Sequence, residues 1–522
     1  MSSILLNVSA PILAVAIATI LTSFWWMFIK KSKRSIPGFA PLPPGPRGLP
    51  LLGYLPFLGT HLHKEFTKLA VTYGPIYKLW LGNKLFLVVS SASTAREIVR
   101  DQDVILANRD PPIAAKASYC GTDLAWLDYN SEWKQMRKVF VHEVMSNSNI
   151  DGCYGLRRQK VRKAIKDVYG KIGCPVNVGD LAFSMNMNVI LSMLWGSTFE
   201  GEEGVTADIE FKKVMSQHMV LLGKPNISEF FPILAKLDLQ GIERQGRKIA
   251  LVYNKFFESA IRRCKAMIES SEKDVDYNEE KRRDVLRVLL ELSSSGESAT
   301  SISTTQLKGL LSDIVIGGAD TTSTTVEWTM AELINNPEIM QKVHHELDQV
   351  VGLDKNVEES HLSGLYYLEA VVKESLRLHP ALPLLVPHRS SKTTRVAGYT
   401  VPENTTVFLN VYAIHRDPEF WESPSQFRPE RFLSGEASKI DLSVNNHNYF
   451  PLGTGRRLCA GLPLAKKMLV YQLASLLHSF DWNLPTGSKM DLSDKFGLVG
   501  KKMEPAIGIP TPRLPNLDLY SS

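Results

Sequence analysis

One cysteine, Cys459, lies where glycines, arginines and the start of a helix come together. The stretch is Phe450-Pro451-Leu452-Gly453-Thr454-Gly455-Arg456-Arg457-Leu458-Cys459-Ala460-Gly461. An apolar repeat with three- and four-residue spacing follows at once and predicts a helix, with Pro463 suited to its first turn. The N–H groups of that helix start would point near the sulfur, and Arg456 and Arg457 add positive charge, which favours a thiolate. Such a thiolate can be a metal ligand, a nucleophile or a redox thiol.

The same stretch resembles the haem-binding loop of the cytochrome P-450 monooxygenases. The resemblance implies that Cys459 is the axial thiolate of haem b (iron protoporphyrin IX), where it pushes electron density onto the iron and favours O–O cleavage. Plant members of the family usually carry phenylalanine at the position of Leu452 and often proline at the position of Ala460. Neither departure disturbs the ligand assignment. The alternative is a buried, inert cysteine on a glycine- and arginine-rich loop.

Charge and cysteine content narrow the classes of function. A net charge of +6 over 522 residues is modest and does not call for nucleic acid. It leaves room for a basic patch that faces an acidic protein or a membrane. The five cysteines show no CxxC and no zinc-like spacing, so neither a disulfide framework nor a zinc site is indicated. Free thiols fit a reducing, cytosol-facing location.

The N-terminal region predicts a membrane anchor. Residues 12–29 carry no charge, and as a helix they would span roughly 27 Å, about the thickness of a bilayer core. The cluster Lys30, Lys31, Lys33 and Arg34 follows and places the downstream chain in the cytosol. A cleaved signal peptide is the alternative, but a basic n-region and a small-residue cleavage site are missing. We expect an anchor with a basic stop in residues 1–34, a proline-rich hinge in 35–50, and a haem-thiolate catalytic domain in 51–522. That organisation implies a single-pass protein of the endoplasmic reticulum membrane, with its catalytic domain facing the cytosol.

The first part of the body is expected to hold two strands and one long irregular stretch. Ile76–Leu81 and Leu85–Val89 read as strands around a Gly-Asn-Lys turn. Residues 109–130 contain two prolines and a glycine, and a loop of this length in a compact protein is usually functional. By resemblance it covers the substrate pocket, with Tyr119 and Thr122 as possible contacts. The rest of the chain is expected to be mostly helical.

Two arginine-containing features can each be interpreted in two ways, either as ordinary surface features or by the resemblance to the family. Trp133 and Arg137 share one helical face, which fits a stacked surface pair. The resemblance implies instead that both donate to a haem propionate, with His388 and Arg457 also at the cofactor. The basic run at 157–163 is typical of a solvated face. In the family a basic proximal face binds the acidic NADPH-cytochrome reductase.

A long, largely apolar helix is predicted from about Thr305 to Leu333, and it contains Gly317-Gly318-Ala319-Asp320-Thr321-Thr322. Adjacent glycines weaken a helix by roughly 1 kcal/mol each, and a polar run inside a buried helix is unusual. The segment resembles the oxygen-activating stretch of the family, where the helix bulges above the haem. The resemblance implies that Asp320 and Thr321 guide protons to the site of oxygen activation. A kinked core helix is the alternative.

Three further residues resemble the structural triad of the family. Glu374 and Arg377 are three residues apart on a predicted helix, which alone is a weak signal. Arg431, within Phe427-Arg428-Pro429-Glu430-Arg431-Phe432, strengthens it. The segment from Ala381 to Pro387 resembles the strand beside the haem. It and a later turn would supply pocket walls, namely Leu384, Leu385, Val386 and Leu498.

These motifs occur in the family's order and cover essentially the whole chain. They indicate a mainly α cytochrome P-450 fold, a helical bundle around haem with small β-sheets, plus an N-terminal transmembrane helix. The implied reaction is NADPH- and O2-dependent hydroxylation of a small lipophilic plant metabolite. The chain also resembles plant microsomal hydroxylases of sesquiterpenes (cadinene, valencene) and of flavones, which leaves terpenoid or flavonoid open. Two alternatives remain: a haem-thiolate enzyme that rearranges or dehydrates its substrate without O2, and a haem-binding carrier or sensor.

Overall fold

The computed structural model describes residues 40–118, 122–196, 202–271, 284–294, 301–442, 446–495 and 497–521. The expected anchor in residues 1–34 lies outside these ranges, and so does Tyr119. Among the helices of the described ranges, none combines the length and the apolar character needed to cross a membrane.

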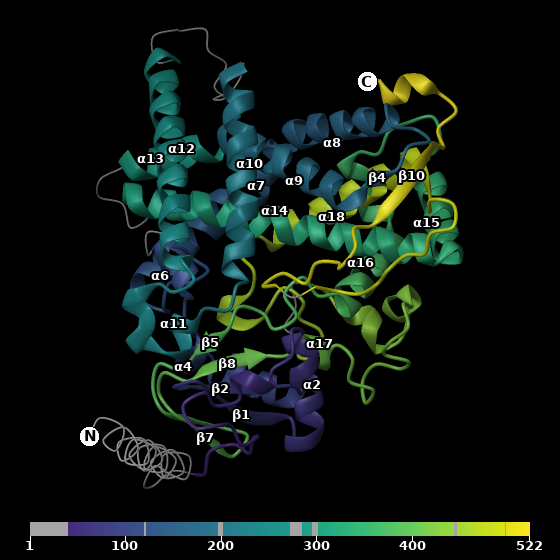
Figure 1. Cartoon of the computed structure of the whole chain (residues 1–522). Helices are drawn as coiled ribbons and strands as arrows, with labels where there is room; N and C mark the ends of the chain where they lie inside the picture. The colour runs from purple at the N-terminus through teal and green to yellow at the C-terminus, as the bar shows by residue number, and fades with distance from the viewer. Residues whose placement is uncertain are drawn as a thin grey trace, which may run out of the picture.

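Helices form most of the molecule (Figure 1). The α-helices are α2 Leu62–Tyr73, α3 Ala92–Arg96, α4 Asp103–Leu106, α5 Ile113–Ser118, α6 Ser131–Val139, α7 Asn147–Gly152, α8 Tyr154–Tyr169, α9 Val178–Trp195, α10 Glu202–Leu222, α11 Ile227–Phe230, α12 Ile242–Ser271, α13 Val285–Ser294, α14 Thr304–Asn335, α15 Pro337–Val350, α16 Tyr366–Leu378, α17 Val411–Ile414 and α18 Leu462–Ser479. Two π-helical segments are η2 Glu97–Asp101 and η3 Phe140–Val144. The 3-10 turns are η1 Leu55–Phe57, η4 Pro232–Leu237, η6 Glu359–Gly364, η7 Pro429–Phe432, η8 Glu436–Lys439, η9 Gly455–Arg457 and η10 Leu517–Tyr520.

Within the residues that the structure describes, three small sheets accompany the helices. The largest has the order β1 (Ile76–Leu81), β2 (Lys84–Val89), β8 (Thr406–Leu409), β5 (His388–Arg389) and β3 (Asn108–Arg109), and only its β2–β8 pairing is parallel. The second runs β4 (Val176–Asn177), β10 (Ile507–Pro512) and β9 (Phe480–Asn483), and the third pairs β6 (Thr394–Val396) with β7 (Tyr399–Val401). The predicted hairpin is confirmed, with its second strand starting one residue earlier. Figure 1 shows the first sheet gathered at one end of the molecule, below the helices.

The proline-rich segment packs against the first strand. The backbone N–H of Lys78 donates to the Pro44 carbonyl at 2.8 Å, and the Lys78 ammonium donates to the Pro43 carbonyl at 2.6 Å. A side chain at Gly45 would collide with the Lys78 carbonyl. Residues 43–45 are therefore fixed on the sheet, because their carbonyls accept from β1 and Gly45 has no Cβ.

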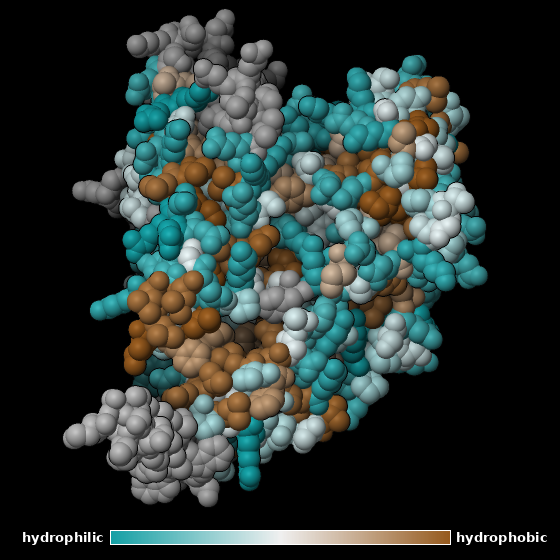
Figure 2. All heavy atoms as spheres, in the orientation of Figure 1, coloured by the Kyte–Doolittle hydropathy of each residue, from teal (hydrophilic) through white to brown (hydrophobic). Residues whose placement is uncertain are grey.

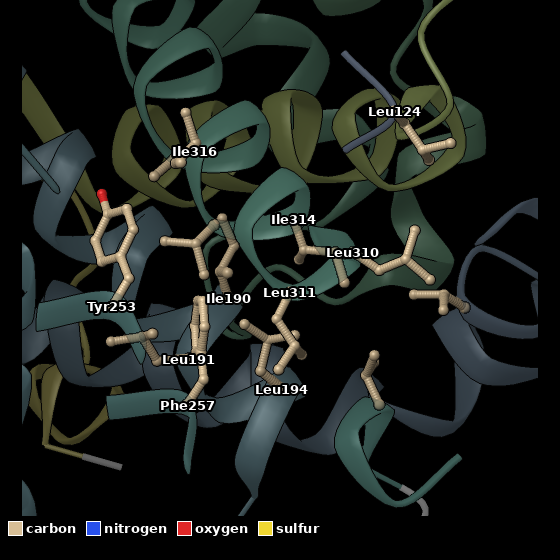
Figure 3. Packing of buried hydrophobic residues seen from close by; sticks show 14 of the residues in the cluster. Leu124, Ile190, Leu191, Leu194, Tyr253, Phe257, Leu310, Leu311, Ile314 and Ile316 are labelled. Atoms are coloured by element: carbon tan, nitrogen blue, oxygen red, sulfur yellow. The ribbon is translucent and has the colours of Figure 1, made fainter. Parts of the chain in front are cut away.

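Helix α14 runs through the centre of the molecule as one unbroken α-helix. Its start carries a capping box, in which Ser303 accepts from the Gln306 backbone and the Gln306 side chain returns to Ser303. The expected long central helix is confirmed, but the bulge expected at Gly317 and Gly318 is not seen, since the segment remains α-helical throughout. Figure 3 shows Leu311 of α14 beside Leu194 of α9, within one buried cluster that both helices share.

The expected strand at 381–387 is not formed, and only His388–Arg389 pair as β5. Pro383 and Pro387 lack the N–H that a strand ladder needs. Leu385 has a φ of 53°, in the left-handed region, and its N–H donates to the Leu382 carbonyl at 3.0 Å. The segment is therefore a turn that presents Leu382 and Leu385 to the interior.

A largely buried ion network, with Glu374 and Arg377 fully buried, supports the region before the cysteine loop. Arg377 Nε lies 2.8 Å from Glu374 Oε2, and Arg431 Nε lies 3.0 Å from Glu374 Oε1. Arg377 also donates to the carbonyls of His415 and Pro424, both at 2.8 Å. Removing one member would leave an uncompensated buried charge, which is strongly destabilising. The structure thus brings Glu374, Arg377 and Arg431 together around backbone carbonyls of the 415–426 segment.

Candidate functional site

A cavity of about 310 Å³ lies between the cysteine loop and α14. Its walls come from segments far apart in sequence. The lining residues used below are Arg109, Trp133, Arg137, Asn186, Asp313, Gly317, Thr321, Leu385, Val386, His388, Arg457, Cys459 and Leu498. Much of the remaining surface is aliphatic, so the cavity combines one thiol and several cations with an apolar interior.

Cys459 faces this cavity at the start of α18. Its sulfur accepts hydrogen bonds from the backbone N–H groups of Gly461 and Leu462, as the predicted helix start requires. Burial raises the pKa of the thiol, while these bonds and the Arg137 guanidinium act to lower it. The N–H donors and the positive charge are the features that stabilise a thiolate once a metal replaces the proton.

Three arginines crowd one side of the cavity without a carboxylate hydrogen-bond partner among the described residues. Arg457 donates to the carbonyls of Ala107, Leu124 and Leu127, at 2.7, 3.1 and 2.6 Å. Arg109 donates to the carbonyls of Val386 and Pro387, at 2.5 and 3.0 Å. Arg137 donates to the Leu458 carbonyl at 2.7 Å.

Burial of these cations has an electrostatic cost that nothing in the described structure fully offsets. Burial and the nearby Arg457 lower the pKa of Arg109, and the Arg109 Nε atom is buried without a hydrogen-bond partner. Burial also lowers the pKa of Arg457 to about 10. Buried charges are normally paired. A group with carboxylates in this cavity would supply the missing partners.

Trp133 and His388 lie at the same end but use their polar atoms differently from the expectation. The Trp133 indole N–H donates to the Leu124 carbonyl at 3.0 Å, so it is not directed at a cavity ligand. Its ring instead lies under the Arg457 guanidinium, 4.4 Å from ring centroid to Cζ. His388 Nδ1 donates to the Leu106 carbonyl at 2.7 Å, and burial lowers its pKa to about 3. Of the two, only His388 has a ring nitrogen left for a ligand.

The donor set fits haem. Haem has an iron that can bind a thiolate, and Cys459 offers one. Haem also carries two carboxylates that need positive partners, and the three arginines offer those. Gly317 on α14 adds room, because a Cβ built there would meet no atom within 4 Å. The residues that the chain itself supplies are therefore matched to a metal group with an anionic edge.

The loop after residue 122 is pinned to both sides of the cavity. The Leu124 N–H donates to Asp313 of α14 at 2.6 Å, and the Leu124 carbonyl accepts from Trp133 and Arg457. Asp123 accepts from the Trp126 N–H at 2.7 Å. Burial raises the pKa values of both Asp123 and Asp313. The loop that was expected to cover the pocket is thus tied to the arginine that fits the cofactor.

Thr122 lies at the edge of this loop and does not line the cavity. Its hydroxyl donates to the Thr305 carbonyl at 3.3 Å, and its own carbonyl packs where a Cβ of Gly309 would be. Among the expected pocket walls, Leu385, Val386 and Leu498 line the cavity. Leu384 instead packs against the cluster built on Phe66 and β1–β2, because the turn at 382–385 directs it to the sheet.

Thr321 and Asp320 point to different surroundings. The Thr321 side chain lines the cavity, and its hydroxyl donates to the Gly317 carbonyl at 2.7 Å. Asp320 is 2% exposed and does not line the cavity, and its Oδ1 lies 2.5 Å from Lys501 Nζ. Successive helical residues point about 100° apart, which explains the separation. The hydroxyl thus faces the cavity. The carboxylate faces the C-terminal hairpin, the segment closed by the antiparallel bridge between Asp494 and Lys502, which carries Lys501.

The basic run at 157–163 is not one free cationic face. Arg157 is fully buried and makes a two-pronged ion pair with Glu359, at 2.7 and 2.8 Å. Arg158 and Arg162 both contact Glu358. Much of the positive charge of α8 is therefore paired with Glu358 and Glu359, two neighbouring glutamates in the segment before α16.

Sequence reasoning missed four residues of the site: Arg109, Asn186, Asp313 and Lys501. Arg109 borders the irregular stretch that drew attention, and Asp313 is a lone acid inside a mostly apolar helical run. Those two signals could have been used. Asn186 and Lys501 carried none, because their partners on α14 are distant in sequence.

Comparison with known proteins agrees with the observed fold. The family model described as Cytochrome P450 matches residues 43–507. Among solved structures, a zebra fish cytochrome P450 with abiraterone superposes with a TM-score of 0.71 at 27% identity, covering 86% of this chain and 99% of that one.

Several plant proteins are similar over nearly their full length. A flavonoid 3'-monooxygenase of Crocosmia x crocosmiiflora is 36% identical over 95% of this chain and 97% of its own. A geraniol 8-hydroxylase of Swertia mussotii is 37% identical over 93% and 95%, respectively. A carnosic acid synthase of Rosmarinus officinalis is 37% identical over 91% and 94%. These relatives differ in what their names say they act on.

Proposed function

The chain belongs to the cytochrome P450 family and is a haem-thiolate monooxygenase, and from this premise we propose that it hydroxylates a small lipophilic terpenoid or flavonoid of plant secondary metabolism. The observation that supports this best is the cavity itself. It is lined by a cysteine and three arginines on one side and by aliphatic side chains on the other. Apolar lining with a few placed polar groups is the usual pattern for a lipophilic ligand.

Its cofactor is haem with a cysteine thiolate as axial ligand. We assign the ligand to Cys459, with Arg109, Arg137 and Arg457 holding the carboxylates and His388 beside them. Bound haem supplies the oxygen chemistry that no side chain can perform. The protein holds the group in place, excludes water from the apolar half of the cavity and delivers protons.

Proton delivery is proposed to run through α14. Thr321 presents a hydroxyl at the cavity wall, where it can hold a water and pass a proton along it. Asp320 lies behind it, paired with Lys501, whose side chain is 36% exposed. This ion pair connects the buried carboxylate to solvent at a point away from the substrate, so protons need not cross the apolar half of the cavity.

Electrons are proposed to come from NADPH through a separate NADPH-cytochrome reductase. Exposed cations gather beside the cysteine loop: Lys134 Nζ lies 4.7 Å and Arg456 Cζ 5.4 Å from the centroid of the Tyr129 ring. Lys138 lies one turn beyond Lys134 on α6 and is also exposed. An acidic partner would be steered to this cluster, and that attraction weakens with salt.

Membrane attachment through residues 1–34 is proposed from the uncharged run and the basic residues after it. Exposed apolar side chains of two segments, one near the start of the described chain and one in and after α11, support it: Leu49, Leu51, Leu52, Phe57, Ile227, Ile233, Leu237 and Leu239. Two of these segments meet at one turn, because Gly82 donates to the Leu52 carbonyl and Asn83 to the Phe230 carbonyl. Figure 2 shows apolar residues gathered over this end. The location that follows is the endoplasmic reticulum membrane, with the body in the cytosol.

Reconstitution of the full chain with a plant NADPH-cytochrome reductase tests the proposal. Geraniol and a flavonoid without a 3'-hydroxyl are supplied separately, and NADPH use, O2 use and product are measured. We expect one hydroxylated product that requires both NADPH and O2, and none from the Cys459→Ala variant. Product formed without NADPH would replace hydroxylation by rearrangement. Haem binding without turnover of any terpenoid or flavonoid would favour a carrier or sensor.

A further inference from the structure

Two buried amides connect three helices next to the cavity. Asn186 of α9 donates from Nδ2 to the carbonyl of Gly318 at 2.6 Å and to that of Ala319 at 2.9 Å, both on α14. Gln472 of α18 donates from Nε2 to Asn186 Oδ1 at 3.3 Å. Asn186 is 1% exposed and Gln472 is fully buried. The helix that begins beside Cys459 is thereby linked to the helix that carries Thr321.

The backbone that Asn186 holds is unusual within α14. Every carbonyl from residue 317 to 321 accepts a side-chain hydrogen bond. Three of these five hydrogen bonds come from hydroxyls of α14 itself: Thr321 to Gly317 at 2.7 Å, Ser323 to Asp320 at 3.0 Å and Thr325 to Thr321 at 2.9 Å. The two carbonyls between them are served by Asn186. Donors added to helix carbonyls shift the local helix geometry, so α9 helps to set the course of this stretch.

The glycine pair makes this contact possible. A Cβ at Gly318 would lie 2.9 Å from the Cδ1 atom of Ile190, one turn along α9 from Asn186. Gly318 therefore lets α9 approach closely enough for the amide to reach the α14 backbone. Gly317, its neighbour, faces open space instead. One glycine serves the packing of α9 and the other serves the cavity.

Gln472 fixes the orientation of the Asn186 amide. An amide group has a donor end and an acceptor end, and only the donor end suits two carbonyls. Because Gln472 presents an N–H to Oδ1, the Nδ2 group is left to face Gly318 and Ala319. Without Gln472 the buried Oδ1 atom would lose its donor, and the two carbonyls alone would hold the amide in this orientation.

We propose that Asn186 is a positioning residue for hydroxylation: oriented by Gln472, it fixes the Gly318–Ala319 backbone and so places the Thr321 hydroxyl at the cavity wall. The Thr321 hydroxyl donates to Gly317, the residue directly before this pair, so a shift of the pair moves the acceptor of that bond. The catalytic consequence rests on the proton-delivery role proposed for Thr321. The mechanical part does not depend on that role.

The test compares Asn186→Leu with Asn188→Leu in the haem-loaded full chain. Asn188 lies two residues away on the same helix, and its amide contacts Lys212 at 2.6 Å rather than α14. Hydrogen–deuterium exchange is followed in a peptide covering residues 316–325, whose Thr322 and Ser323 N–H groups bond to the two carbonyls in question. We expect exchange there to rise roughly tenfold in Asn186→Leu, because two hydrogen bonds are lost, and to stay unchanged in Asn188→Leu.

A second variant, Gln472→Leu, keeps Asn186 in place and removes only the group that orients it. It should raise exchange in the same peptide by a smaller factor. If Asn186→Leu does not retain haem, the exchange measured in Gln472→Leu tests the proposal instead. Unchanged exchange of the 316–325 peptide in whichever of the two variants retains haem overturns the proposal.

The yield of product per NADPH then distinguishes the positioning role of Asn186 from the proton role of Thr321. In the reconstituted enzyme, Asn186→Leu should form less product and more peroxide per NADPH, and adding it to Thr321→Ala should change little further. Normal coupling in Asn186→Leu beside impaired coupling in Thr321→Ala overturns the positioning role. Normal coupling in Thr321→Ala itself refutes the proton role of Thr321, while the exchange result still stands on its own.

Discussion

The Nζ atom of Lys501 lies 2.5 Å from Oδ1 of Asp320, and this ion pair joins the C-terminal hairpin to the central helix. Asp320 Oδ2 is buried and has no hydrogen-bond partner. The same hairpin places Leu498 in the cavity wall, and the N–H of Gly500 donates to the Ala381 carbonyl at 2.9 Å. One short segment therefore contributes to the substrate surface and to the surroundings of the buried acid.

Replacing Lys501 with methionine should slow product formation while haem content stays normal. The substitution removes the ion-pair partner that links Asp320 to solvent, so proton supply should become limiting. We expect a loss of roughly a hundredfold, at the low end of what a placed proton-transfer group contributes, and a larger solvent deuterium isotope effect. Lys495→Met, an exposed lysine of the same hairpin, is the control. Equal rates and isotope effects in both variants would remove Lys501 from the path.

Arg109→Leu should weaken haem retention. The guanidinium is buried and has an unpartnered Nε, so a cofactor carboxylate is its natural counter-charge. Haem transfer to apomyoglobin should be roughly tenfold faster or more than in the parent, which corresponds to the loss of one charge-assisted hydrogen bond. Arg395→Leu changes an exposed arginine on β6 and should have no effect. A transfer rate equal to that of the parent would place the carboxylates elsewhere.

Glu374→Gln should cost about 3–5 kcal/mol of unfolding free energy, since it leaves two buried guanidinium groups without their anion. The matched surface change is Glu430→Gln, whose ion pair with Lys342 is largely exposed and should be worth under about 1 kcal/mol. Chemical denaturation followed by tryptophan fluorescence measures both. Similar midpoints for the two variants would show that the network adds little to stability.

Much of the architecture could be predicted because its signals are local. The hairpin at 76–89, the helix after Cys459 and the helix containing Asp320 each follow from spacing within one segment. Glu374 and Arg377 are one turn apart, so a helix brings them together by itself. The strand expected at 381–387 failed for a local reason too, since its prolines and the left-handed Leu385 favour a turn.

The contacts that arrange the site join segments far apart in sequence, and no periodic pattern in the sequence predicts them. Asn186 reaches carbonyls 132 and 133 residues further along the chain, and Gln472 is 286 residues from Asn186. Backbone carbonyls carry no sequence identity, so nothing in either segment marks the pairing. The same holds for Arg109 and Arg457, which are held by carbonyls of remote turns. Such contacts become visible only when the packing of whole helices is known.

Acid should destabilise the protein partly through His218. This imidazole lies between Ser118 (2.6 Å) and Tyr253 (3.2 Å), and burial lowers its pKa to about 4. Below its ordinary pKa near 6.5 the unfolded chain takes up a proton that the folded chain does not, so stability falls from pH 6.5 towards pH 4 and changes no further below that. At pH 5 the loss attributable to this group is about 2 kcal/mol. Replacing His218 with glutamine should shrink the difference in unfolding free energy between pH 7 and pH 5 by that amount, and an undiminished difference would assign the sensitivity to other groups.

Thr321→Ala and Thr322→Ala should separate the two neighbouring hydroxyls. The Thr321 side chain is half-buried at the cavity wall, whereas Thr322 is 6% exposed, although both residues contribute to the lining. Either change removes a hydroxyl and exchanges a methyl for a hydrogen, so haem content and the affinity for substrate should remain near those of the parent. Only the loss at Thr321 removes the hydroxyl placed to hold a water in the dry half of the cavity.

We therefore expect Thr321→Ala to lower product per NADPH by roughly tenfold and to raise peroxide correspondingly, since slow proton delivery lets reduced oxygen escape. Thr322→Ala should do less, because its side chain points about 100° away around the helix. Product and peroxide are measured per NADPH for both variants, and full coupling in Thr321→Ala, or a larger loss in Thr322→Ala, would move the proton path to another group.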